Sequence, residues 1–231
     1  MEVNHVAIIL DGNRRWARSK KMLPQLGHRE GAKNLENFAI EANKMGLKYL
    51  TVYVFSTENW KRSKEEVGYL MKLFHIYFAR LKKRLSKYNM KIKFLGIDEN
   101  VEEKILKEKK ESEELSKDAT GLQLNVCFNY GGRREITDAA KKIAQKVLDG
   151  KLKIDEITEE VFANNLYTAG IPDPDILIRT SGEQRLSNFL PWQLTYTEFF
   201  FVEKHWPEFS IEDLKDVLEQ YKNRDRRFGG K

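Results

Sequence analysis

The stretch HVAIILDGNRRWAR, residues 5–18, determines how the rest of the chain is interpreted. Its consecutive apolar residues, 6–10, predict a buried parallel strand, and the Asp-Gly-Asn that follows predicts a turn. The strand therefore ends at the carboxylate of Asp11, with the cations Arg14 and Arg15 close behind. Ligands of open α/β sheets bind beyond the carboxyl ends of the strands, so this combination predicts a metal with a phosphorylated ligand. From these local features alone, an ordinary turn with solvated arginines is an equal alternative.

Composition limits the class of protein. With 231 residues, 41% of them hydrophobic and 33% charged, the chain is expected to form one α/β domain covering residues 1–231. Its formal net charge of +6 attracts anions, whether nucleic acid, lipid headgroups or diphosphates, and does not choose among them. The single cysteine, Cys127, excludes an intrachain disulfide and is expected to be a packed apolar residue rather than a nucleophile.

The chain carries no pattern typical of a membrane span. A helix that crosses a bilayer needs about 20 consecutive apolar residues, and no segment comes near this length. The N-terminus lacks the pattern of a secretory signal. We therefore expect a soluble, cytoplasmic protein, which would meet a lipid substrate at the membrane surface.

Strand and helix patterns alternate along the chain. Further strands are expected at residues 49–56, 91–96, 122–128, 175–180 and 198–202, and helices at 29–45, 64–88, 99–117, 133–148, 158–167 and 211–224. This alternation predicts a mostly parallel central sheet of about six strands with helices on both faces. The strongly charged segment 99–117 is expected to be a solvated helix rather than a binding surface.

Polar clusters follow four of the predicted strands. They occupy residues 11–18, 56–62, 129–134 and 179–187. Because parallel strands end at the same edge of a sheet, these clusters are expected to converge. The guanidinium groups of Arg179 and Arg185 suit phosphate oxygens in bidentate fashion. Surface pairing of such arginines with Glu58 or Glu183 is the alternative.

Several familiar signatures are missing. The sequence has no GxxxxGK[ST] loop, no GxGxxG after the first strand and no HExxH motif, which argues against the enzymes that use them. A magnesium ion needs only one or two carboxylates together with substrate phosphates. Asp11, helped by Glu198, would supply these carboxylates.

Six motifs resemble those of one enzyme family. In order they are HVAIILDGNRRWA, GHREGA, FSTENWKR, NYGGRRE, IRTSGEQRLSNFLPWQ and RDRRFGG, which together span residues 5–230. They look like the motifs of the cis-prenyltransferases, in particular those that make undecaprenyl diphosphate. The resemblance implies Mg²⁺-dependent addition of isopentenyl diphosphate units to an allylic primer such as farnesyl diphosphate. The implied product is a cis-polyprenyl diphosphate, with undecaprenyl diphosphate for a cell-wall lipid carrier as the default, and shorter or longer products as alternatives.

The same resemblance implies roles for individual residues. Asp11 and Asn59 are the expected catalytic residues, and Asp11 and Glu198 the expected Mg²⁺ ligands. The expected substrate-binding residues are Gly12, Asn13, Arg14, Arg15, Trp16, His28, Ser56, Thr57, Glu58, Trp60, Arg62, Arg179, Arg185, Leu186 and Ser187. Those up to His28 correspond to the allylic diphosphate pocket, those at 56–62 to a loop that closes over the substrates, and the last four to the isopentenyl diphosphate site. Packing is the alternative role for the two tryptophans.

The expected reaction also needs a proton acceptor and a dry channel. Asn59 is neutral and a poor base, so the diphosphate itself or a water molecule is an equal candidate for the acceptor. The apolar stripe of Phe74, Phe78 and Leu81 is the expected wall of the channel for the growing chain, with core packing as its alternative role.

The last predictions concern partners. The resemblance implies a homodimer in which Arg227, Phe228 and Gly229 lie near the partner's site, with peripheral membrane contact for product release and no nucleic acid. Many members of the family have glycine at the position of Arg14 and arginine at that of Pro24. Arg14, Lys20 or Arg29 is therefore expected to replace the diphosphate contact that Pro24 lacks. A nucleic-acid-binding protein and a non-catalytic subunit of a heteromeric enzyme are the competing interpretations.

Overall fold

The computed structural model describes residues 3–224, which contain one six-stranded sheet. Its strands are β1 (His5–Ile9), β2 (Tyr49–Ser56), β3 (Lys91–Leu95), β4 (Gln123–Tyr130), β5 (Ile176–Thr180) and β6 (Glu198–Val202). They lie in the order β3-β4-β2-β1-β5-β6, and every neighbouring pair is parallel. The predicted α/β fold with a parallel sheet is confirmed.

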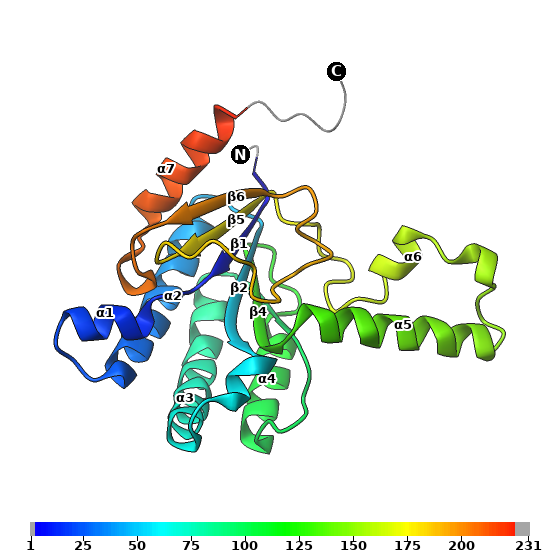
Figure 1. Ribbon diagram of the computed structural model, residues 1–231, viewed down its shortest axis with the longest axis horizontal. Helices are drawn as coiled ribbons and strands as arrows, with labels where there is room; N and C mark the ends of the chain where they lie inside the picture. The colour runs from blue at the N-terminus through cyan, green and yellow to red at the C-terminus, as the bar shows by residue number, and fades with distance from the viewer. Residues whose placement is uncertain (1–2, 225–231) are drawn as a thin grey trace.

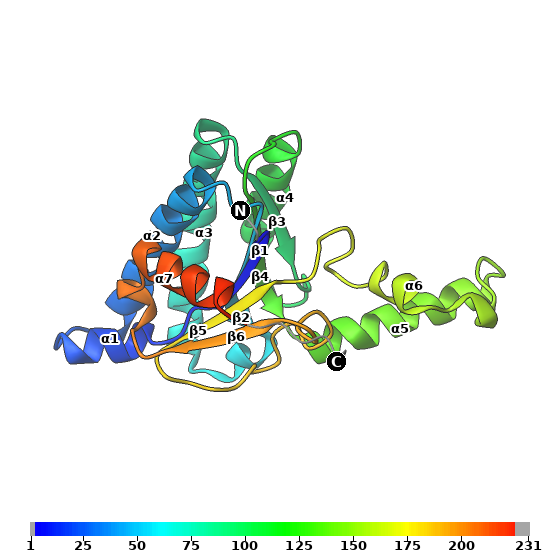
Figure 2. The same ribbon diagram turned by 90° about the horizontal axis from the view of Figure 1, so that it is seen from above.

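Helices cover the two faces of the sheet unequally. The described helices are α1 (Asn13–Ser19), α2 (Pro24–Lys44), α3 (Lys64–Lys87), α4 (Glu103–Ser116), α5 (Gly132–Leu148), α6 (Glu159–Ala163) and α7 (Ile211–Lys222), with short 3-10 helices η1 (Thr57–Lys61), η2 (Ile154–Glu156) and η3 (Trp206–Glu208). In Figures 1 and 2, α2, α3 and α7 lie along one face, whereas α5 and α6 project from the other side as an arm. Loop residues such as Phe189, Leu190 and Leu194 cover that second face instead.

The central strands are buried on both faces, as expected for a parallel sheet between two layers. In β1, Val6 and Ile8 belong to the larger apolar core with α2, α3 and α7, while Ala7 and Ile9 belong to the smaller one. Cys127 is buried in the smaller core, as predicted. Within the described residues, no helix combines the length and the apolar character needed to span a membrane.

The main difference from the predicted elements follows β1. The turn is shorter than predicted, because helix α1 already starts at Asn13. Gly12, directly before the helix, has a φ of 99°. A Cβ atom at Gly12 would lie 1.9 Å from the Ser181 hydroxyl, so both the backbone angle and the available space require glycine. The next helix begins at Pro24 rather than at residue 29, with the proline in the first turn, where its missing N–H is tolerated. The helix expected at 158–167 is only the five-residue α6.

Candidate active site

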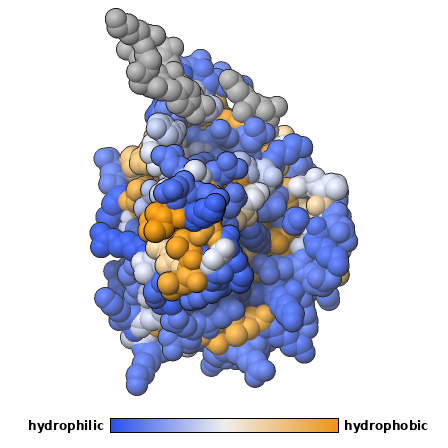
Figure 3. Space-filling view, turned by 90° about the vertical axis from the view of Figure 1, so that its right-hand side faces the viewer, coloured by the Kyte–Doolittle hydropathy of each residue, from blue (hydrophilic) through white to orange (hydrophobic). Residues whose placement is uncertain are grey.

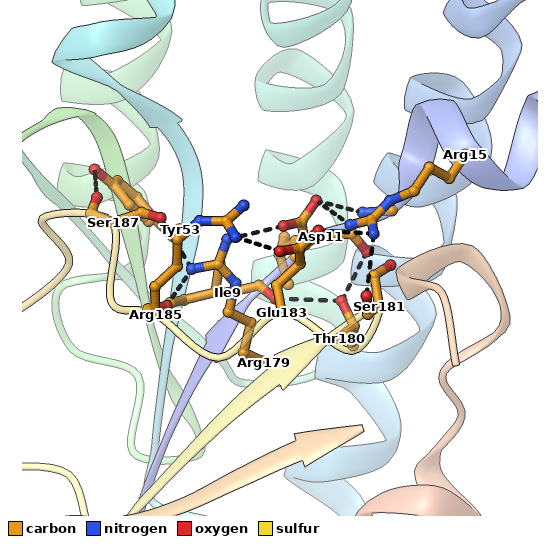
Figure 4. A network of polar contacts seen from close by, with 12 residues as sticks. Ile9, Asp11, Arg15, Tyr53, Arg179, Thr180, Ser181, Glu183, Arg185 and Ser187 are labelled. Carbon is orange, nitrogen blue, oxygen red and sulfur yellow. Dashed lines mark hydrogen bonds and ion pairs between the residues drawn. The ribbon is translucent and has the colours of Figure 1, made fainter. Parts of the chain in front are cut away.

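The register of the sheet brings polar residues from separate strands together. Ile9 at the end of β1 is level with Tyr53 in β2 on one side and Arg179 in β5 on the other. Asp11 follows Ile9 by two residues, and its Oδ2 accepts a hydrogen bond of 2.9 Å from Nη2 of Arg179 (Figure 4). The polar clusters at 11–18 and 179–187 therefore meet, as predicted, whereas Arg134 of the cluster at 129–134 pairs with Glu99 and Asp138.

Arg179 holds the loop after β5 against the end of β1. Its side chain is only 3% exposed, and Nη1 donates to the carbonyl of Arg185 and to the hydroxyl of Ser187, the latter at 2.9 Å. Ser187 has a φ of 49°, a backbone conformation that few residues other than glycine adopt readily. The tight path of residues 181–187 is therefore fixed by one buried guanidinium.

Asp11 is held ionised by its neighbours. Partial burial alone would raise its pKa, but the hydrogen bonds from Arg179 and from the Gly12 N–H, with the charges of Arg179 and Arg15, hold the pKa below its usual value. The Asp11 backbone is fixed as well, because its carbonyl accepts from the hydroxyl of Thr180 (2.7 Å) and from the N–H of Trp206 (3.0 Å). A charged carboxylate in a fixed position suits a divalent cation.

A second carboxylate lies beside Asp11. Arg15 pairs with Asp11 through Nη2 (3.2 Å) and with Glu183 through Nη1 (2.8 Å), and Arg185 pairs with the other oxygen of Glu183. Figure 4 shows these groups as one network. Sequence reasoning considered Glu183 only as a surface partner, although its place between Arg179 and Arg185 in one loop could have indicated that it joins the cluster.

Two arginines and a histidine surround Glu66 at the start of α3. Oε2 of Glu66 lies 3.3 Å from Arg14, Oε1 lies 3.0 Å from Arg62, and His28 lies 3.7 Å away. Burial, followed by the charge of Arg62, lowers the pKa of His28 from 6.5 to about 4, so this imidazole is neutral at pH 7. Glu66 was missing from the predicted site.

The segment 56–62 forms the short helix η1 and its flanks. Oδ1 of Asn59 accepts from the N–H of Ser56 (3.1 Å), and Glu58 accepts from the amide of Asn188 (2.8 Å), beside the loop that Arg179 fixes. The Trp60 indole donates to Asn129 (2.7 Å), and its ring packs within the larger apolar core. Trp60 thus has a packing role in this structure.

Three adjoining cavities lie at this edge of the sheet and share Leu10, Asn13 and His28 in their walls. Two are polar. The predicted residues that line them are Asp11, Gly12, Asn13, Arg14, Arg15, His28, Ser56, Asn59, Arg62, Arg179 and Ser187. The third is largely apolar, with an empty volume of about 810 Å³ that is partly open to solvent, and its wall includes Phe74, Phe78 and Leu81.

Three buried polar atoms in these cavities have no hydrogen-bond partner in the protein. They are Oδ1 of Asn13, Nε2 of His28 and Nε of Arg179. Buried polar groups are normally satisfied, so this concentration of unpaired atoms indicates a place for a polar ligand. Arginine side chains outnumber carboxylates in the walls of these cavities, which favours an anionic ligand.

The comparisons with known proteins agree with this geometry. A family model described as "Putative undecaprenyl diphosphate synthase" matches residues 9–229. The chain belongs to the undecaprenyl diphosphate synthase family. The predicted family and transferase activity are therefore confirmed: the protein is an isoprenyl transferase of the cis-prenyltransferase type.

Individual relatives of this isoprenyl transferase cover nearly the whole chain. A farnesyl-diphosphate-specific ditrans,polycis-undecaprenyl-diphosphate synthase of Micrococcus luteus is 46% identical, over 98% of this chain and 91% of the relative. A geranylgeranyl-diphosphate-specific tritrans,polycis enzyme of Pyrococcus horikoshii is 47% identical, over 97% and 86%. The crystal structure of lavandulyl diphosphate synthase from Lavandula x intermedia, in complex with dimethylallyl diphosphate, superposes with a TM-score of 0.95 at 39% identity, over 99% and 98% of the two chains.

The structure does not bring Glu198 to the site of the isoprenyl transferase. Glu198 begins β6 and is level with Ile176, which is level with Val6, so it lies at the amino end of the sheet. Asp11 lies five residues further along the strand direction than Glu198, at about 3.3 Å per residue, and two strands away, at about 4.8 Å per strand. The two residues are therefore roughly 19 Å apart. Its carboxylate pairs instead with Arg224 (2.7 Å). The prediction that Glu198 and Asp11 of one chain share a magnesium ion is corrected by this separation.

Other predicted residues are not in the walls of these three cavities. They are Trp16, Thr57, Glu58, Trp60, Arg185 and Leu186. Trp16 lies on α1, where the Lys20 ammonium is 5.9 Å from the centre of its ring. Arg185 still belongs to the cluster through Glu183. Arg227, Phe228 and Gly229 lie outside the described residues.

Proposed function

We propose that this enzyme condenses isopentenyl diphosphate onto farnesyl diphosphate in repeated Mg²⁺-dependent steps, giving a cis-polyprenyl diphosphate with undecaprenyl diphosphate as the expected product. The observation that carries the proposal is the arginine cluster around Asp11 at the mouth of an apolar cavity. The farnesyl specificity named for the Micrococcus luteus relative supports this primer. Geranylgeranyl diphosphate is the second candidate, because the Pyrococcus horikoshii relative is named for it.

Two sets of side chains, each containing arginines, suit two diphosphates. Arg179, with Ser187 and Arg185 behind it, is assigned to isopentenyl diphosphate, and Arg14, Arg15, Arg62 and His28 to the allylic diphosphate. In the described structure their partners are carboxylates, among them Glu66 and Glu183. Diphosphate oxygens satisfy guanidinium groups in the same bidentate way, so substrates would take over these contacts. Holding both diphosphates fixes the reacting carbons next to each other.

The site offers one carboxylate to a magnesium ion, which is enough when substrate phosphates supply further ligands. Asp11 would supply one oxygen ligand and substrate phosphates the others. When bound, the ion supplies positive charge that stabilises the leaving diphosphate. The protein contributes the same kind of stabilisation through Arg15 and Arg179, which are already positioned on either side of Asp11.

The proton lost after condensation goes to a group other than Asn59. The Asn59 amide is neutral, and its oxygen already accepts from the Ser56 N–H, which fixes it as a positioning group. The departing diphosphate is a stronger base than an amide and lies in the same pocket. We therefore assign proton acceptance to that diphosphate.

The assembly proposal is a cytoplasmic homodimer of single catalytic domains, residues 1–231, with transient membrane contact for product release and no nucleic-acid partner. Figure 3 views the arm of α5 and α6 from its tip and shows an apolar patch within a hydrophilic surface. Leu148 and Ile154 at this end of the arm are 81% and 73% exposed. Such a patch is suited to contact with a second copy. Light scattering of the purified protein should give twice the mass of the chain, and the mass of one chain would refute the dimer.

The direct test of the activity is incubation of the purified protein with radiolabelled isopentenyl diphosphate, farnesyl diphosphate and Mg²⁺. Products are dephosphorylated and sized by chromatography, with geranylgeranyl diphosphate in a parallel reaction. The proposal predicts labelled polyprenyl products that disappear when EDTA is added. Failure to incorporate label with either primer would refute the proposed reaction.

A further inference from the structure

One asparagine in the loop after β5 joins segments that are far apart in the sequence. The Asn188 side chain accepts a hydrogen bond from the Arg133 N–H through Oδ1 (2.8 Å) and donates one from Nδ2 to Oε1 of Glu58 (2.8 Å). Its carbonyl accepts from the Gly132 N–H at 2.8 Å. Asn188 therefore links the segment after β2 and the start of α5 to the loop that follows β5.

The conformation of Asn188 and the two glycines opposite it allow this close approach. Asn188 has a φ of 66°, in the left-handed region that asparagine adopts more readily than most residues. A Cβ atom at Gly131 would lie 2.6 Å from the Thr57 hydroxyl and 3.0 Å from Nδ2 of Asn188. One at Gly132 would lie 2.0 Å from the ring of Pro191. The Gly-Gly pair of the NYGG motif thus makes room for both the segment after β2 and the loop after β5.

The two segments that Asn188 joins contribute to the wall of one polar cavity. Asn59 and Arg62 come from the segment after β2, and Ser187 comes from the loop after β5. Asn59 directly follows Glu58, and Ser187 directly precedes Asn188, so the link lies next to the cavity wall on both sides. A displacement of about 1 Å between reacting groups can lower a rate roughly 100-fold, so a fixed distance between these two parts of the wall matters for catalysis.

We propose that Asn188 is a positioning residue, which fixes the segment 56–62 relative to the loop 181–187 and so sets the distance between the two diphosphates. The inference rests on the proposed function, because Arg62 is assigned to the allylic diphosphate and Ser187 to isopentenyl diphosphate. Asn188 itself is not in the wall of the three cavities described above. It acts through the residues beside it rather than on a substrate.

Kinetics of variants that exchange the carboxylate and the amide test the inference. Burial raises the pKa of Glu58, but hydrogen bonds, foremost that from Asn188, hold this pKa below its usual value, so the carboxylate is ionised at neutral pH. Asn188→Asp keeps the size of the side chain and the acceptor for the Arg133 N–H, but places a second carboxylate against Glu58. We expect kcat/KM for isopentenyl diphosphate to fall about 10- to 100-fold. Adding Glu58→Gln supplies an amide N–H for the new carboxylate and should recover most of the loss.

Asn89→Asp is the matched control. Asn89 also has a positive φ, of 50°, and its amide accepts from the Thr120 N–H (3.2 Å) and donates to the uncharged Thr120 hydroxyl (3.0 Å). It lies just before β3, at the amino end of the sheet, away from the cavities. The same substitution there should leave kcat and both KM values at their wild-type levels. Wild-type kcat/KM in a folded Asn188→Asp protein, or no recovery on adding Glu58→Gln, would overturn the inference.

Hydrogen exchange separates this inference from the proposed reaction. It is measured on the full chain without substrates, by mass spectrometry of peptides that cover residues 56–62. Asn188→Asp should speed exchange there about tenfold or more, the added Glu58→Gln should slow it again, and Asn89→Asp should leave it unchanged. Unchanged exchange in Asn188→Asp would overturn the inference even if condensation itself fails. Failure of the wild-type protein to condense, with faster exchange in Asn188→Asp, would refute the proposed reaction and support the link.

Discussion

The guanidinium of Arg179 lies 2.9 Å from the carboxylate of Asp11, although 168 residues separate the two in sequence. The parallel register of β1 and β5 creates this contact, since Arg179 is level with Ile9 and Asp11 emerges just beyond it. The pair therefore has two roles. It joins the residues that follow β1 to β5, and it holds an ionised carboxylate oxygen of Asp11 at the cavity.

Because of this link, substitutions of Asp11 should differ in their effect on stability. Asp11→Ala leaves Arg179 without its charged partner and should lower the free energy of unfolding by about 1–3 kcal/mol, less than for a fully buried pair because Asp11 is 30% exposed. Asp11→Asn keeps an oxygen that accepts a hydrogen bond and should lower it by less. Urea denaturation at pH 7 measures both, and equal losses would contradict the role of the pair.

His28 should make stability depend on pH. Its pKa in the folded protein is about 4, below the 6.5 of the unfolded chain, so between these values the unfolded chain binds more protons. Stability should therefore fall as the pH falls through this window, by about 1 kcal/mol from pH 7 to pH 5.5 for this residue. His28→Gln should lose that part of the dependence, while His5, whose burial also lowers its pKa to about 4, keeps its own. An unchanged dependence in His28→Gln would refute the assignment.

Substitution of two helical glycines by alanine should affect stability in opposite directions, because Gly27 is in close backbone contact and Gly68 is not. A Cβ at Gly27 would lie 2.0 Å from the backbone oxygen of Asn13, so Gly27→Ala must push α1 from α2 and should destabilise by about 1–3 kcal/mol. Gly68 in α3 has nothing within 4 Å of such an atom, and Gly68→Ala should stabilise by roughly 1 kcal/mol. Thermal unfolding of the two variants should thus shift in opposite directions, and a shared direction would contradict the close packing of α1 on α2.

Substitution of Arg185 should weaken binding of isopentenyl diphosphate more than binding of the allylic primer. Its guanidinium is 60% exposed and contacts Glu183, so Arg185→Ala should change stability little. Loss of a charge-assisted contact should raise KM for isopentenyl diphosphate by about 10- to 100-fold and leave KM for the allylic primer nearly unchanged. Arg80→Ala, on the outer part of α3, is the matched control. Equal increases in both KM values would contradict the division of the cluster into two diphosphate sites.

Much of the fold could be predicted because several strands are mainly apolar segments that end in polar residues. β1, which is followed closely by Asp11, and β5, which carries Arg179 near its carboxyl end, show this plainly. Helix α1 could not be predicted, since a seven-residue helix is unstable alone and this one depends on contact with α2. Nothing in the local sequence indicates that contact.

The carboxylates show a different limit. Glu198 was assigned by resemblance, yet it precedes the apolar residues of its strand, which already indicates the opposite edge of the sheet. Glu66 and Glu183 were missed because their roles depend on tertiary contacts with Arg14, Arg62 and Arg15.

The turnover of Asp11→Asn tests the central claim most directly, namely that this carboxylate serves the condensation. The variant is compared with the wild-type enzyme in incorporation of labelled isopentenyl diphosphate onto farnesyl diphosphate at saturating Mg²⁺. The account predicts a loss of about 100- to 1,000-fold or more in a protein that remains folded by circular dichroism. Wild-type turnover in a folded Asp11→Asn protein would contradict it.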